Sequence, residues 1–189
     1  TRVRSSAASD VYKRQDVFEV ASTPKSYGSQ LYAAEISKRS SSVVDTLVAA
    51  GAVFLGKTVT AEFALYKPGA TCNPHNIQHT PGGSSSGSAA AVADCQAPIA
   101  LGTQTAGSIV RPASYCGVIG YKPTLGRYST TGVRETSPTL DTVGFFCRSA
   151  KDASFVDEVL AEREPVDATG EEPNKFTVGI YQHQSITEA

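Results

Sequence analysis

Two loops rich in glycine and serine hold the residues whose types and spacing could do chemistry. Residues 82–88 read Gly-Gly-Ser-Ser-Ser-Gly-Ser, and residues 102–108 read Gly-Thr-Gln-Thr-Ala-Gly-Ser. A lone loop of this kind is usually a tight turn with helix-capping serines. Gly107 allows a sharp turn that gathers several N–H groups near the Ser108 hydroxyl, as an oxyanion hole requires. The pair of loops therefore favours chemistry over two structural turns.

The bulk composition excludes several other classes of function. The chain has 189 residues, 40% of them hydrophobic, and a net charge of -1. Such a balance gives no electrostatic case for a nucleic acid or an anionic membrane as partner. No apolar run approaches the roughly 18 residues that span a bilayer. The four cysteines are widely spaced without a CxxC pair, which predicts free thiols in a reducing, cytoplasmic setting.

The histidines do not point to a familiar catalytic arrangement. His75, His79 and His183 are the only three in the chain. A Ser-His-Asp triad on an α/β-hydrolase would need a nucleophile elbow, a G-x-S-x-G turn that follows a strand. No predicted strand leads into the G-x-S-x-G letters at residues 83–87. We therefore expect the histidines to be surface or structural residues, and we expect no metal or organic cofactor.

The strands that must position the two loops follow from short apolar runs. Such runs predict strands at residues 16–20, 52–55, 98–101 and 176–181. The polar segment 162–175 contains two prolines and is typical of a linker or surface loop.

Helices are predicted between these strands. Ser42 and Ser149 each precede an aspartate by three positions, a spacing typical of a helix start. Gly51 lies where a helix C′ glycine is expected, and the small residues 88–95 predict a further helix. Helices that alternate with short apolar strands indicate the α/β class.

One motif would mislead a reader who matched letters alone. Residues 51–58 read Gly-Ala-Val-Phe-Leu-Gly-Lys-Thr, the pattern of a phosphate-binding loop. Such a loop must follow a strand and open a helix, so that its N–H groups surround phosphate. Here the predicted order is helix, glycine, strand. We reject the nucleotide-binding interpretation and expect Lys57 to be an ordinary lysine at the end of a strand.

The central segment resembles the amidase signature family. The matching patterns are Gly-Gly-Ser-Ser-x-Gly-Ser at residues 82–88 and Leu-Gly-Thr-x-Thr-x-Gly-Ser-x-x-Arg-Pro-Ala at residues 101–113. A third, Cys-Gly-Val-Ile-Gly-Tyr-Lys-Pro-Thr, occupies residues 116–124. Weaker matches lie on both sides, and the resemblance runs from about residue 16 to residue 160. It implies an amidase-signature α/β fold, with a mixed β-sheet core surrounded by helices, incomplete in this chain.

The resemblance assigns roles to particular positions. The family uses a serine nucleophile, a second serine preceded by a cis peptide bond, and a lysine. Ser108 falls on the nucleophile and Ser84 on the cis serine. Arg111 and Gly83 are expected to contact substrate, with Arg111 favouring a carboxylate-bearing one. The implied oxyanion hole consists of the N–H groups of Thr105, Ala106, Gly107 and Ser108.

One position departs from the family pattern. The family's lysine precedes an acidic residue in a short strand, and Gln15 stands in that place before Asp16. Residues 1–15 are polar and aperiodic, as in an adapter-derived or disordered segment, and the chain contains no methionine. We therefore expect residues 16–189 to be a partial amidase-signature domain whose C-terminal half is missing, marginally stable and prone to association. A junction just before Asp16 explains Gln15 most simply.

The expected function is hydrolysis of a linear carboxylic amide through a Ser–cisSer–Lys mechanism. Because glutamine cannot accept a proton, we expect this chain to be inactive. Two alternatives stay open: a glutamine-dependent amidotransferase subunit of the same fold, and a catalytically dead module that binds an amide or acid. The expected partner is a small amide, with neither nucleic acid nor membrane, and the full-length parent could form a homodimer.

Overall fold

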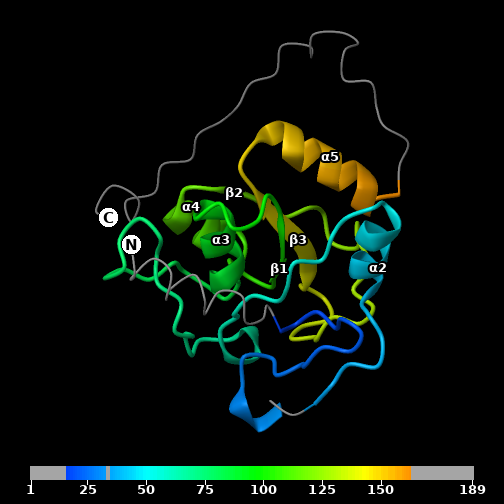
Figure 1. Cartoon of the computed structure of the whole chain (residues 1–189), viewed down its shortest axis with the longest axis horizontal. Coiled ribbons are helices and arrows are strands. Elements are labelled where there is room, and N and C mark those ends of the chain that lie inside the picture. Colours follow the sequence, from blue (N-terminus) through cyan, green and yellow to red (C-terminus); the bar gives the residue numbers. More distant parts are fainter. Residues whose placement is uncertain (1–15, 33–34, 163–189) are drawn as a thin grey trace, which may run out of the picture.

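A three-stranded sheet lies at the centre of the computed structural model, which describes residues 16–32 and 35–162 (Figure 1). Its strands are β1 (Ala100–Gln104), β2 (Ile119–Tyr121) and β3 (Thr142–Cys147). The spatial order is β1-β3-β2, and β3 is antiparallel to both neighbours. Strands β1 and β2 thus run in the same direction, and β3 lies between them. The α/β class is confirmed, while both pairings in the described sheet are antiparallel where a mixed sheet was expected.

Strand β3 separates two hydrophobic cores. All six of its residues are buried. Phe145 packs in one core with Val156 of helix α5 (Ala150–Leu160). Phe146 packs in the other with Val92 of helix α3 (Ser86–Ala93). Because successive side chains of a strand point to opposite faces, a strand covered on both faces is apolar throughout and shows no alternation.

The described residues form four α-helices around this sheet, and capping residues explain where some of them begin and end. Helix α5 begins as predicted, since the Ser149 hydroxyl accepts a hydrogen bond from the N–H of Asp152. Helix α2 has Ser41 as its N-cap, one residue before the predicted start, and no side chain caps it. It ends in a Schellman motif at Gly51, where φ is +89°. The four helices are α2 (Ser42–Ala49), α3 (Ser86–Ala93), α4 (Val110–Cys116) and α5 (Ala150–Leu160).

Helix α3 follows the first serine loop and is buried along nearly its whole length. Its residues are small, so that neighbouring backbone approaches closely. A Cβ atom at Gly87 would lie 2.5 Å from the backbone nitrogen of Val59, which requires glycine there. The helix predicted at residues 88–95 therefore exists, but it begins two residues earlier.

The strand predicted at residues 52–55 does not form among the described residues. These residues follow α2 as irregular chain, and the side chains of Val53 and Leu55 are 81% and 59% exposed. The run is apolar, but no described strand pairs with it. The strand predicted at residues 16–20 is reduced to one bridge between Phe18 and Val133.

Several predictions concern residues outside the described ranges. Gln15, the segment 1–15, most of the predicted linker and the strand predicted at 176–181 all lie there. Within the part of the chain that is described, no helix is both long and apolar enough to cross a membrane. The same part contains no cluster of His, Cys, Asp or Glu side chains that could hold a metal ion.

Candidate functional site

Ser84 is a buried residue of the first serine loop. The peptide bond between Gly83 and Ser84 is cis, as expected at this position. The Ser84 carbonyl accepts hydrogen bonds from Ala61 N (2.9 Å) and Thr60 Oγ1 (3.1 Å). The residue is 1% exposed, and its hydroxyl has no hydrogen-bond partner among the described residues. A buried hydroxyl normally finds a partner, so this one, like those of Ser37, Ser41 and Thr71, is available for another group.

The second loop lies directly beside the first. The N–H of Ser85 donates to the carbonyl of Ser108 at 3.4 Å, and the Ser85 hydroxyl donates to Thr103 O at 3.3 Å. Ser108 is half-buried and Ala106 is exposed, so this loop reaches the surface while Ser84 stays beneath it. The structure thus brings together the two loops that carry Ser84 and Ser108, which lie 24 residues apart in the sequence.

Gln104 shapes the second loop, and the sequence reasoning missed it. Its side chain is buried at the end of β1. The Oε1 atom accepts from Ile109 N (2.8 Å) and Val110 N (3.0 Å), while Nε2 donates to Ala106 O (2.8 Å). One amide therefore holds the loop on both sides of Ser108. The sequence did offer one indication of this role, because Gln104 has an amide side chain and immediately precedes Thr105, the first predicted oxyanion-hole residue.

Arg111 lies one turn after Ser108, on helix α4. Its Nε and Nη2 atoms donate to the carbonyl of Gly83 at 2.9 and 2.6 Å. The exposed guanidinium therefore binds the carbonyl of Gly83, the residue that precedes the cis bond. Binding of a substrate carboxylate by Arg111, and contact of substrate with Gly83, stay predictions.

A buried ion pair lies at the start of the described chain. Lys57 Nζ is 2.6 Å from Asp16 Oδ1 and donates to Pro24 O at 2.9 Å. The other carboxylate oxygen of Asp16 accepts from the N–H and hydroxyl of Ser26. Lys57 is thus a buried, paired residue and not an ordinary lysine at the end of a strand, which corrects the sequence prediction. Asp16 directly follows the position assigned to the catalytic base.

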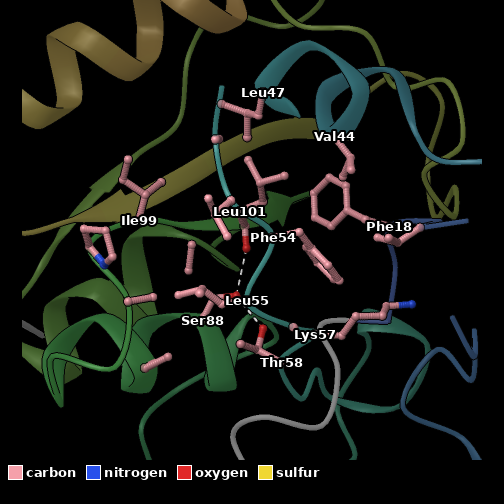
Figure 2. Close-up of a pocket in the computed structure, with 18 of the residues that line it drawn as sticks. Phe18, Val44, Leu47, Phe54, Leu55, Lys57, Thr58, Ser88, Ile99 and Leu101 are labelled. Atoms are coloured by element: carbon pink, nitrogen blue, oxygen red, sulfur yellow. Dashed lines mark hydrogen bonds between the residues drawn. The ribbon is translucent and has the colours of Figure 1, made fainter. Parts of the chain in front are cut away.

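An apolar hollow of about 480 Å³ reaches the end of the first serine loop at Ser88 (Figure 2). Segment 52–58, which is exposed as far as residue 56, forms one wall, and neither Ser84 nor Ser108 lines it. In Figure 2 the hollow is framed mainly by hydrocarbon side chains, among them Val44, Leu47, Phe54, Leu55, Ile99 and Leu101. A phosphate would find little polar lining here, which agrees with the rejection of the nucleotide-binding motif.

Comparison with known proteins gives a consistent result. The sequence model of the Amidase family matches residues 15–187. A glutamyl-tRNA(Gln) amidotransferase subunit of Deinococcus radiodurans is 40% identical over 172 residues, 87% of this chain. The native peptide amidase of Stenotrophomonas maltophilia superposes with a TM-score of 0.74 at 38% identity over 85% of this chain. A glutamyl-tRNA(Gln) amidotransferase subunit of Thermotoga maritima superposes with the same TM-score of 0.74, at 35% identity over 78%.

All three proteins are much longer than this chain. The chain spans 36% of the Deinococcus protein, 35% of the peptide amidase and 34% of the Thermotoga protein. The similarity therefore covers about a third of the length of each relative.

Proposed function

Because this chain belongs to the amidase family, we propose that its two serine loops form the centre of an amide-cleaving site, with Ser108 as nucleophile. The observation that carries the proposal is the Ser84 hydroxyl, which is buried and unpartnered among the described residues. Its loop also contacts the loop of Ser108 through Ser85. A relay serine needs this placement, because it must exchange protons with two neighbours.

The proposed reaction has two steps. The Ser108 oxygen attacks the amide carbon, and its proton passes through Ser84 to a base. The N–H groups of the loop held by Gln104 stabilise the negative oxygen of the tetrahedral intermediate. The C–N bond then breaks, and the nitrogen takes a proton back through the relay. Water repeats the sequence on the Ser108 ester and releases the carboxylate.

Position 15 is where the proposed relay ends, immediately before Asp16. A lysine there could accept the proton if its surroundings lowered its pKa toward the working pH. The side-chain amide of Gln15 does not take up a proton. We therefore propose that the chain as written turns over amides weakly or not at all, and that a lysine at position 15 restores the reaction.

A second candidate is release of ammonia from glutamine for transfer to an acceptor. It is favoured by the names of the relatives, since curated proteins 40–43% identical to this chain are subunits of glutamyl-tRNA(Gln) amidotransferases. The structural relatives include a peptide amidase as well as one such amidotransferase protein. The candidates share the serine site and differ in the amide they accept.

The test uses the Gln15→Lys variant of the full-length parent, with two substrates. We expect glutamine to give ammonia if the site is of the amidotransferase type, and C-terminal peptide amides to give ammonia if it is of the peptide-amidase type. Ser108→Ala in the same background must remove either activity. Turnover that survives Ser108→Ala would overturn the assignment of the nucleophile.

A catalytically dead binding module is the remaining alternative, and Gln15 is the residue that favours it. Such a module would bind an amide without forming an ester at Ser108. Unchanged inactivity after Gln15→Lys, together with saturable binding of an amide by calorimetry, would support it against both enzymatic candidates.

A further inference from the structure

Thr105, the first residue of the predicted oxyanion hole, is tied to the sheet by a side chain that the proposed mechanism does not use. Strand β1 pairs with β3 in a register that ends at Gln104 opposite Thr142. One position further, Thr105 stands across from Asp141. The Thr105 hydroxyl donates to Asp141 Oδ1 at 2.5 Å, and both residues are half-buried.

Asp141 is itself held firmly in the loop that precedes β3. Its second oxygen accepts from the N–H groups of Thr136 (2.6 Å) and Ser137 (2.9 Å). Its own N–H donates to the Ser137 carbonyl at 2.9 Å. A carboxylate with several donors is fixed in position, so it can serve as an anchor for Thr105.

The same stretch of chain also contacts the segment that follows position 15. Two residues before Thr136, the N–H of Arg134 donates to the carbonyl of Val17 at 2.7 Å. Val133 forms a bridge with Phe18. Residues 133–141 therefore contact both the second serine loop (residues 102–108, the oxyanion loop) and residues 16–18 next to the proposed base (the base segment).

We propose that Asp141 is a positioning residue that acts through Thr105 to hold the oxyanion loop in register with the base segment. This inference rests on the proposed function, because the loop matters to catalysis only if Ser108 is the nucleophile. Gln104 holds the loop from the interior, and Asp141 holds its first residue from the adjoining strand end. The N–H groups then face the developing oxyanion without reorganisation during the reaction.

The first arm of the test uses the chain as it is and does not depend on catalysis. We compare amide hydrogen exchange in a peptide covering residues 102–110 for the parent, Thr105→Val and Asp141→Asn. Valine matches threonine in shape but lacks the hydroxyl. We expect faster exchange in both variants and no change in a peptide covering residues 150–160. The exposed control Asp152→Asn should leave exchange at residues 102–110 unchanged. Parent-like exchange in Thr105→Val would overturn the anchoring.

The second arm measures kcat and KM in the Gln15→Lys background. Titration with a fluorophosphonate counts the active sites, so that kcat is expressed per active site. We expect Thr105→Val and Asp141→Asn each to lower kcat about tenfold to a hundredfold with KM nearly unchanged, because oxyanion contacts act on the transition state. The double variant should lose no more than either single one, since one interaction is removed. Thr105→Ser, which keeps a hydroxyl, should lose several-fold less than Thr105→Val.

The possible outcomes distinguish a failure of the positioning role of Asp141 from a failure of the proposed function. Absence of any Ser108 adduct in the reference chain would overturn the proposed function, and with it the catalytic part of this inference. A reference chain that labels at Ser108 while Thr105→Val keeps its full kcat would overturn the positioning role alone. Additive losses in the double variant would likewise show that Asp141 does not act through Thr105.

Discussion

Lys57 Nζ lies 2.6 Å from Asp16 Oδ1, and both side chains are buried, with exposures of 5% and 0%. The two residues are 41 positions apart in the sequence. Their pairing fixes the backbone immediately after position 15 against the segment that leads to Thr60, whose hydroxyl bonds the Ser84 carbonyl. The proposed base position and the proposed relay serine are therefore tied to one short piece of chain.

Removing Lys57 should destabilise the fold strongly. In Lys57→Met the Asp16 carboxylate stays buried without its cation, and breaking a buried pair in this way costs about 3–5 kcal/mol. Urea unfolding followed by circular dichroism measures the change in the free energy of unfolding. Lys67→Met is the matched control, because Lys67 is 75% exposed in its ion pair with Glu62. Equal, small changes in both variants would contradict a structural role for the buried pair.

Gln104→Leu should loosen the loop that carries Ser108. The substitution keeps roughly the same volume but leaves the N–H groups of Ile109 and Val110 without their acceptor. Ile109 is buried, and a buried N–H group costs about 1–3 kcal/mol when unsatisfied. We expect a lower melting temperature and, in the Gln15→Lys background, slower fluorophosphonate labelling at Ser108.

The control for that variant is Gln78→Leu, which changes an exposed glutamine outside both loops. Gln104→Glu serves as a second comparison, since it keeps an acceptor oxygen but loses the donor to Ala106 O. Labelling in Gln104→Leu as fast as in Gln78→Leu would show that the loop holds its shape without the amide.

Arg111→Ala should slow reaction with every amide. The guanidinium donates twice to Gly83 O, so its loss should disturb the turn that carries Ser84 whatever the substrate. We expect similar reductions in kcat/KM for a neutral and an acidic amide in the Gln15→Lys background. A loss confined to the acidic amide would instead support the predicted contact with a substrate carboxylate.

Acid should weaken the contact between helix α5 and residues 127–128. Hydrogen bonds from Arg127 at 2.6 and 2.5 Å are the main cause that lowers the pKa of Asp157, and Tyr128 also donates to this carboxylate. A depressed carboxyl pKa gives stability that is present above the unfolded value and is lost as pH falls through the folded value.

The corresponding experiment is unfolding as a function of pH. Asp157→Asn should be less stable than the parent at neutral pH, and the difference should shrink below about pH 4, the ordinary range of an aspartate. Arg127→Met should flatten the same part of the profile. A difference between parent and Asp157→Asn that is constant from pH 7 to pH 3 would contradict this assignment.

Local signals in the sequence predicted much of the fold. Ser149 caps α5 and Gly51 ends α2, because both effects depend on neighbouring residues alone. The cis bond at Ser84 and the contact between the two serine loops agree with the family pattern. The exposed segment 52–55 was misjudged, because an apolar run predicts extended chain but cannot show which strand will pair with it.

Long-range partners could not be read in this way. Asp16 meets Lys57, and Thr105 meets Asp141, only because the fold brings distant segments together. Gln104 stood at a variable place in the motif, and its three hydrogen bonds depend on the curvature of the loop around Ser108. The expected cytoplasmic location and homodimer stay predictions.

The central claim is that Ser108 attacks the amide and that position 15 supplies the base. The most direct measurement treats the parent and its Gln15→Lys variant with a fluorophosphonate, then locates the adduct by peptide mass spectrometry. We predict an adduct on Ser108 that forms at least about a hundredfold faster with lysine at position 15, the scale of general-base catalysis. Rapid labelling of the parent that Gln15→Lys leaves unchanged, or an adduct on Ser84 or Ser86 instead of Ser108, would contradict the account.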